Sequence, residues 1–128
     1  MSYYFSKTLD VNFADAVLRV INALKAEGFG IVTEIDMQKT LKTKLNVDFR
    51  EYRILGACNP SLAYDALQIE SKVGTMLPCN VIVQDIGGGK TEIASIDPVA
   101  SMQAIDNPKL KAAAELVRAK LKAAIAAI

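Results

Sequence analysis

An Asn or Asp followed directly by Pro occurs at three places in the chain, at Asn59-Pro60, Asp97-Pro98 and Asn107-Pro108. Asn and Asp are favoured helix caps, and proline suits the first helical position because the amide hydrogen that it lacks has no partner there. Each pair therefore predicts the beginning of a helix.

The first half of the chain is expected to alternate strands with helices. A strand is predicted over 3–9, followed by a helix that Asn12 caps and Gly28 ends, and the apolar residues of this helix keep the 3.6-residue period. Residues 29–35 are expected to form a short strand. Asp36 then caps a brief, weakly amphipathic helix that carries several lysines.

The second half adds a helix over 60–71, a C-terminal helix from 108, and strands over 52–58, 79–86 and 90–96. The last two strands form a hairpin around Gly87-Gly88-Gly89. A strand rather than a helix follows these glycines, so they do not form a phosphate-binding loop.

This order of elements, with its short connections, predicts one α+β domain over residues 1–128. We expect two layers, with a mostly antiparallel, curved sheet and helices packed on one face. The other face is then either exposed to water or buried against a second copy of the chain.

The composition excludes several classes of chemistry. The chain has no histidine, which rules out Ser–His and Cys–His catalytic pairs and His-ligated zinc or haem. Fifteen Lys and Arg face fourteen Asp and Glu, so the net charge of +1 provides no general attraction for nucleic acid or an anionic membrane. Neither a signal peptide nor a membrane-spanning stretch is visible, so we expect a cytoplasmic protein without nucleic-acid or membrane partners.

Cys58-Asn59-Pro60 is the most suggestive local feature. It places a thiol just before the start of a helix, where the helix dipole and the unpaired amides stabilise an anion and lower the pKa of a thiol. Asn59 as the actual cap would turn Cys58 partly away. The alternative is a small buried residue at the end of a strand, which is how free cysteines often behave.

Pro78-Cys79 places a second thiol at the start of a predicted strand. If this strand neighbours the one that ends at Cys58, the two thiols lie close enough to hold a soft metal such as Cu(I) or to form a reversible disulfide. There is no Cys-x-x-Cys pair and no evident third ligand, so a packing role is the alternative. No carboxylate pair shows the contrasting environments that acid–base catalysis needs, and no catalytic residue or cofactor is assigned.

Two segments resemble those of the domain of unknown function 302 family of bacteria and archaea. They are Ile54-Leu55-Gly56-Ala57-Cys58-Asn59-Pro60 and Leu77-Pro78-Cys79-Asn80-Val81-Ile82-Val83, and the resemblance covers almost the whole chain. It implies a two-layer α+β fold similar to that of the TATA-box-binding protein, and a homodimer. The family brings no established activity, and a shared fold implies no DNA binding.

The sequence therefore favours a homodimeric binding module over an enzyme. Its expected ligand is an apolar small molecule, a soft metal or sulfur, bound in a pocket near two thiols. The expected binding residues are Cys58, Asn59, Pro60, Pro78 and Cys79. The alternative is a non-catalytic homodimeric interaction or regulatory subunit in which both cysteines are structural.

Overall fold

The computed structural model describes residues 2–128. The chain runs in the order β1 (Tyr4–Leu9), α1 (Phe13–Ala26), β2 (Gly30–Asp36), α2 (Met37–Leu45), β3 (Tyr52–Cys58), α3 (Pro60–Ile69), the 3₁₀ helix η1 (Ser71–Met76), β4 (Cys79–Gly87), β5 (Lys90–Ile96), α4 (Pro98–Ser101) and α5 (Pro108–Ala126). The predicted order of strands and α-helices is confirmed. The helix predicted over 60–71 ends at Ile69, and the separate turn η1 follows it.

Capping side chains set the starts of the α-helices. An Asn or Asp side chain accepts a hydrogen bond from a first-turn amide at each of α1 to α5, and these caps are Asn12, Asp36, Asn59, Asp97 and Asn107. Such a bond pairs one of the amides that the first turn of a helix leaves without a partner. The local chemistry of the sequence thus fixes where the helices begin.

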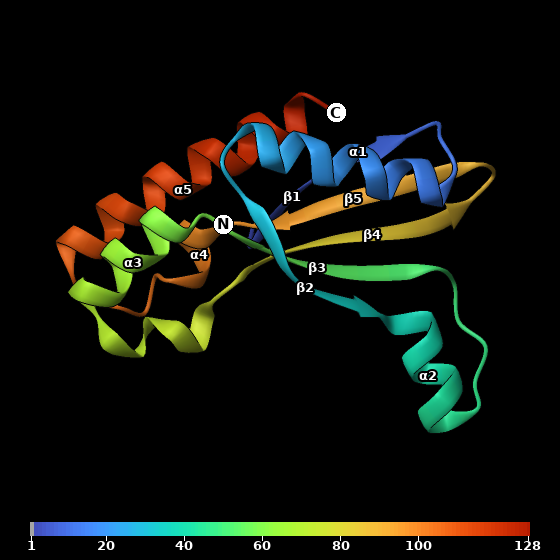
Figure 1. Ribbon diagram of the computed structural model, residues 1–128, viewed down its shortest axis with the longest axis horizontal. Coiled ribbons are helices and arrows are strands. Elements are labelled where there is room, and N and C mark those ends of the chain that lie inside the picture. Colours follow the sequence, from blue (N-terminus) through green and yellow to red (C-terminus); the bar gives the residue numbers. More distant parts are fainter. Residues whose placement is uncertain (1) are drawn as a thin grey trace.

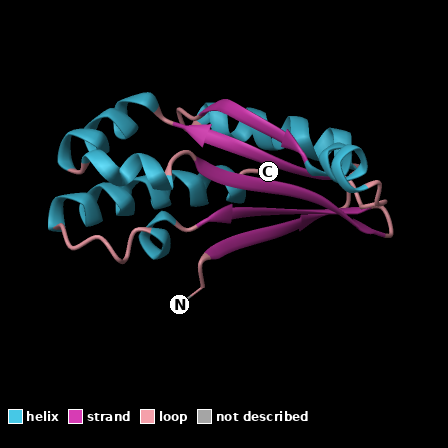
Figure 2. Cartoon of the chain, turned by 90° about the horizontal axis from the view of Figure 1, so that it is seen from below, coloured by secondary structure: helices cyan, strands magenta, loops and turns pink. Residues whose placement is uncertain are grey.

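The strands form one sheet in the order β1-β5-β4-β3-β2, and every neighbouring pair is antiparallel. Helices α1 and α5 cover one face of this sheet (Figure 1). The view from below shows strands along most of the opposite face, with no helical layer over them (Figure 2). The predicted two-layer α+β architecture is confirmed, and the sheet is antiparallel throughout.

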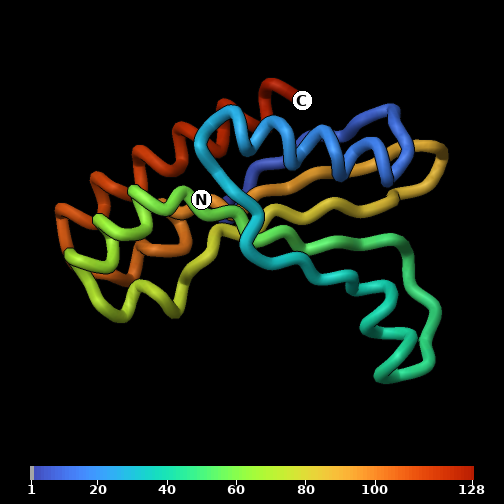
Figure 3. The backbone as a smooth tube through the Cα atoms, in the orientation of Figure 1, coloured from blue at the N-terminus to red at the C-terminus, as the bar shows by residue number. Residues whose placement is uncertain are grey.

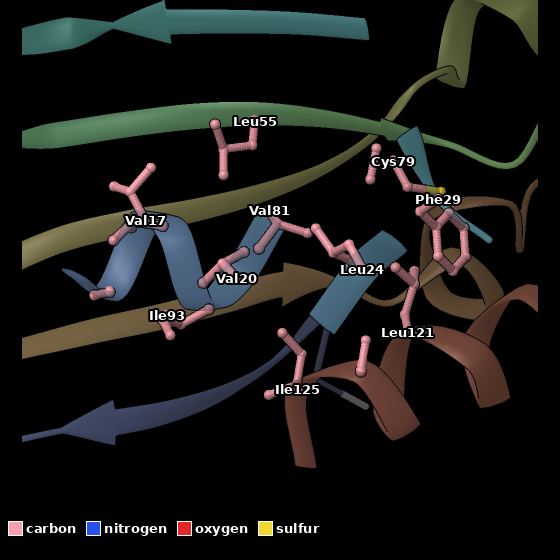
Figure 4. Close-up of a cluster of buried hydrophobic side chains, with 14 of the residues drawn as sticks. Val17, Val20, Leu24, Phe29, Leu55, Cys79, Val81, Ile93, Leu121 and Ile125 are labelled. Carbon is pink, nitrogen blue, oxygen red and sulfur yellow. The ribbon is translucent and has the colours of Figure 1, made fainter. Parts of the chain in front are cut away.

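Two hydrophobic clusters fill the interior. The first lies between the sheet and helices α1 and α5 (Figure 4), and its fully buried members include Val20, Leu24, Leu55, Val81 and Ile93. The second lies beyond the end of the sheet, and its buried members are Ala66, Val73, Met102, Leu110 and Ala114. Helix α5 contributes to both clusters, so it ties the end of the sheet to the smaller helices.

An apolar row crosses the uncovered face. The strand register aligns Ala94, Ile82, Ile54 and Ile35 on four neighbouring strands. Side chains alternate between the faces of a sheet, and the neighbours of these residues, such as Val81 and Leu55, belong to the buried core. The row therefore faces away from α1 and α5, and we call this surface the open face.

Candidate functional site

The two segments singled out in the sequence meet at one end of the sheet. β3 and β4 are antiparallel neighbours, and Ala57 of β3 pairs with Cys79 of β4. Cys58 follows Ala57 directly, so both thiols lie at the same end of two adjacent strands. Both cysteines are free thiols, Cys58 half-buried and Cys79 buried. The two thiols were expected to lie close together if these two strands were neighbours, and the strands are neighbours.

An apolar cavity of about 40 Å³ lies at this end of the sheet. Four of the five expected binding residues line it, namely Cys58, Asn59, Pro78 and Cys79. Pro60 is not part of the lining and occupies the first position of α3. The other lining residues are Phe29, Ala57, Leu62, Ala63, Ala66, Leu77, Met102, Leu110, Ala113, Ala114 and Val117.

The cavity occupies the junction between the two hydrophobic clusters. Phe29 and Cys79 in its wall belong to the cluster under the sheet, where their side chains lie beside each other (Figure 4). Met102 and Leu110 in the opposite part of the wall belong to the cluster among the smaller helices. The space is therefore a gap left where two separately packed cores come together.

Asn59 joins the cavity to the start of α3 and the end of α1. Its side-chain oxygen Oδ1 accepts a hydrogen bond from the amide of Leu62 at 3.2 Å, so Asn59 and not Cys58 is the cap. Its amide nitrogen Nδ2 would lie 2.9 Å from a Cβ atom at position 28. Gly28 also has a positive φ of 86°, so glycine is required there on two counts.

Pro78 is held against the open face by a second close approach. A Cβ atom at Gly56 would lie 2.6 Å from Cγ of Pro78, and it would also overlap the hydroxyl of Thr33. Gly56 therefore allows Pro78 and Thr33 to lie directly on the backbone of β3. This contact fixes the residue that enters β4 and leads to Cys79.

The two thiols differ in their environments. Burial raises the pKa of the Cys79 thiol from its ordinary value of 9.0 to about 11, and the neighbouring Cys58 contributes in the same direction. Cys79 is therefore a neutral thiol at pH 7. The thiolate is the form that attacks electrophiles, so Cys79 is a poor nucleophile unless a bound ligand displaces its proton.

The chemistry available at the cavity is soft and largely apolar. Within residues 2–128 no group of three or more His, Cys, Asp or Glu side chains is placed to hold a metal ion. In the same part of the chain, every fully buried side-chain nitrogen or oxygen has a hydrogen-bond partner. The site therefore offers two thiols and the thioether of Met102 in a largely apolar wall rather than a polar or multi-carboxylate centre.

Sequence reasoning did not find the greater part of the wall. Phe29, Leu62, Met102 and Leu110 carry no local signal of a binding site, because apolar residues on helices and strands are typical of any core. Only the thiols and the cap-then-proline motif distinguish this region along the chain.

The fold and the cavity together define the class of this protein. It is a small α+β domain whose antiparallel sheet carries its main helices on one face, and an apolar cavity lined by two thiols lies at one end of that sheet. Residues 5–128 match the family model described as domain of unknown function DUF302, and the chain belongs to this family. The resemblance seen in the sequence is thus confirmed.

A similar solved structure is the crystal structure of an uncharacterized conserved DUF302 protein from Bacillus stearothermophilus. It is 27% identical, the match covers 98% of each chain, and the TM-score is 0.90. No match is found among curated proteins. None of the helices within residues 2–128 is long and apolar enough to cross a membrane.

Proposed function

We propose that the protein is a homodimeric binding module that holds a small, soft ligand between Cys58 and Cys79. The size of the cavity supports this choice of ligand. Sites for drug-sized molecules measure roughly 300–1,000 Å³, whereas a single water needs roughly 10–15 Å³. A cavity of about 40 Å³ suits a ligand of one to a few atoms.

The observation that carries the proposal is the meeting of both thiols of the chain at one apolar cavity. Soft thiolate ligands select Cu(I), which distinguishes this site from one built for zinc with its four ligands. Cu(I) is therefore the ligand that we propose. Binding displaces the thiol protons, so the affinity rises with pH below the pKa of Cys79.

The test is a titration of the full chain with Cu(I) under anaerobic conditions, in competition with a chromogenic Cu(I) chelator. We expect one equivalent to bind, and we expect Cys58→Ser and Cys79→Ala each to weaken binding by more than about tenfold. Met76→Leu is the matched control, because it removes a thioether of similar size at a methionine that does not line the cavity.

Native mass spectrometry of protein purified without oxygen, followed by denaturation of the same sample, identifies what is bound. Cu(I) lost on denaturation supports the proposal. A sulfur adduct that survives denaturation and maps to Cys58 would instead favour a sulfur-binding module. Cysteine variants that bind Cu(I) as tightly as the unmodified chain would contradict the thiol site in either form.

The open face supports the homodimer, and it also favours a second candidate function. An antiparallel sheet that faces water usually carries polar residues, whereas this one carries a row of isoleucines. If neither thiol binds a ligand, the chain is better described as a homodimeric interaction or regulatory subunit with structural cysteines. Sedimentation velocity over a range of micromolar concentrations tests the dimer independently of the cavity.

A further inference from the structure

Helix α2 and the segment 46–51 form an arm that leaves the body of the protein. The arm projects on the side of the sheet opposite to α1 and α5, at the end of β2 and the start of β3 (Figures 1 and 3). No residue of α2 is buried, and Leu45 and Val47 are 65% and 43% exposed. A helix of nine residues is too short to be stable in water on its own, so its apolar side is expected to have a partner.

The arm is nevertheless a defined structure rather than a loose loop. Asp36 caps α2 by accepting a hydrogen bond from the amide of Lys39 at 3.0 Å. Gln38 donates to the carbonyl of Phe49, also at 3.0 Å, which ties the helix to the returning segment. The exposed apolar side chains are thus presented on a preformed surface.

Within residues 2–128, no helix covers the open face next to the arm. A hollow of about 420 Å³ lies on it, with Tyr4, Tyr52, Ile82 and Glu92 among its lining residues. Tyr4 is 45% exposed, and Ile35 at the end of the isoleucine row is 43% exposed. The arm and this face therefore both present exposed apolar side chains, and they do so on the same side of one molecule.

The areas involved indicate a second copy as the partner. Five strands about 4.8 Å apart, with about six residues each, present roughly 450 Å² per copy, so two open faces alone bury roughly 900 Å². That total is below the roughly 1,200–2,000 Å² of a stable interface. Two arms, each with a helical footprint of roughly 130 Å² against the partner, raise the buried total to roughly 1,160 Å², above the roughly 1,000 Å² that a specific interface needs.

Charge supports the same arrangement. Within residues 2–128, Lys39 and Lys44 on the arm make no ion pair, and neither does Glu92 on the open face. In the strand register, Glu92 of β5 lies opposite Gln84 of β4, and Gln84 lies opposite Tyr52 of β3. These three residues therefore form a row at the strand ends nearest the arm. If two copies were related by a two-fold axis parallel to the strands, the arm at the β2 edge of one sheet would lie at the β1 side of the other sheet, beside this row.

We infer that two copies of this chain associate through their open faces, with the α2 arm of each copy packed over the open face of the other. This inference rests on the homodimer of the proposed function and names the surfaces that form it. It also gives the arm a partner surface and places the lysines of the arm near Glu92, whose carboxylate accepts a hydrogen bond from Gln84 at 2.8 Å but makes no ion pair within residues 2–128.

The test compares two exposed leucines on opposite sides of the molecule by sedimentation equilibrium. Leu45→Asp on the arm is expected to raise the dimer dissociation constant more than tenfold, and Leu18→Asp on α1, where the leucine is 60% exposed, is expected to leave it unchanged. Lys44→Glu is expected to weaken the dimer, and Glu92→Lys in the same chain is expected to restore part of the loss.

The outcomes separate this inference from the proposed function. A dimer that Leu45→Asp leaves as tight as the unmodified one would overturn the arm interface while the homodimer stands. A chain that is monomeric at every concentration would overturn both, and would leave the arm and face to a different protein. Cu(I) binding by Leu45→Asp is expected to match that of the unmodified chain, which shows that the variant remains folded.

Discussion

The raised pKa of Cys79 predicts a loss of stability in alkaline solution that comes from one side chain. The folded chain holds the pKa of this thiol at about 11, against an ordinary value of 9.0. Because the folded-state pKa is the higher one, the stabilisation is complete below pH 9 and is lost as the pH rises toward 11. At pH 11 the unfolded thiol is almost fully ionised while the folded thiol is half ionised, and the difference is about 2 kcal/mol.

Urea unfolding at pH 8 and pH 11 measures this loss, with Cys79→Ala as the reference. Other groups also ionise over this range, so the informative quantity is the difference between the two proteins. We expect the unmodified chain to lose about 2 kcal/mol more of its unfolding free energy than Cys79→Ala does. Equal losses in both proteins would refute the argument, because they would show that the thiol is not desolvated in the folded state.

Three further predictions concern the cavity and the sheet. Iodoacetamide at pH 7.5 is expected to alkylate Cys58 much faster than the buried Cys79, as followed by peptide mapping; equal rates would contradict the difference in burial. Gly56→Ala is expected to destabilise the fold by about 1–3 kcal/mol in urea unfolding, whereas Gly30→Ala, where a Cβ atom meets nothing within 4 Å, avoids this steric penalty. Ala66→Val is expected to fill part of the cavity and to weaken Cu(I) binding in the chelator assay without unfolding the chain.

The local elements of this fold were accessible from the sequence because their signals are local. An N-cap acts through an amide two or three residues away, so Asn12, Asn59 and Asn107 announce their helices directly. The strand over 52–58 and the one over 90–96 were predicted with the boundaries that the structure shows. The helix predicted to reach residue 71 is shorter, because Glu70 leaves the helical conformation and starts the separate turn η1.

The order of the strands was not accessible in the same way. The placement of β1 beside β5 depends on pairs such as Tyr4 with Ile96, which are far apart in the sequence. No periodicity within either strand specifies that pairing. For the same reason, the sequence could predict that Cys58 and Cys79 lie close together only on the condition that β3 and β4 are neighbours in the sheet.

The cavity itself depends on still more distant contacts. Its wall combines Phe29 after α1 with Met102 after α4, and the gap lies where two separate clusters, both of which include residues of α5, come together. No single residue or local motif in the sequence indicates a cavity of this kind. What the sequence does contain is the unusual chemistry at its edge, and this explains why the thiols were found and the enclosure was not.

The cavity and the arm lie at opposite ends of β3. This separation determines whether the proposed Cu(I) site and the proposed dimer interface affect each other. Tyr52 begins the strand beside the arm and Cys58 ends it at the cavity, so the seven residues place them roughly 20 Å apart. Sites at such a distance without shared contacts usually act independently. Coupling between binding sites is also reciprocal, so a ligand that tightened the dimer would bind the dimer more tightly by the same factor. The geometry therefore predicts that Cu(I) affinity does not change with protein concentration across the range in which dimers form.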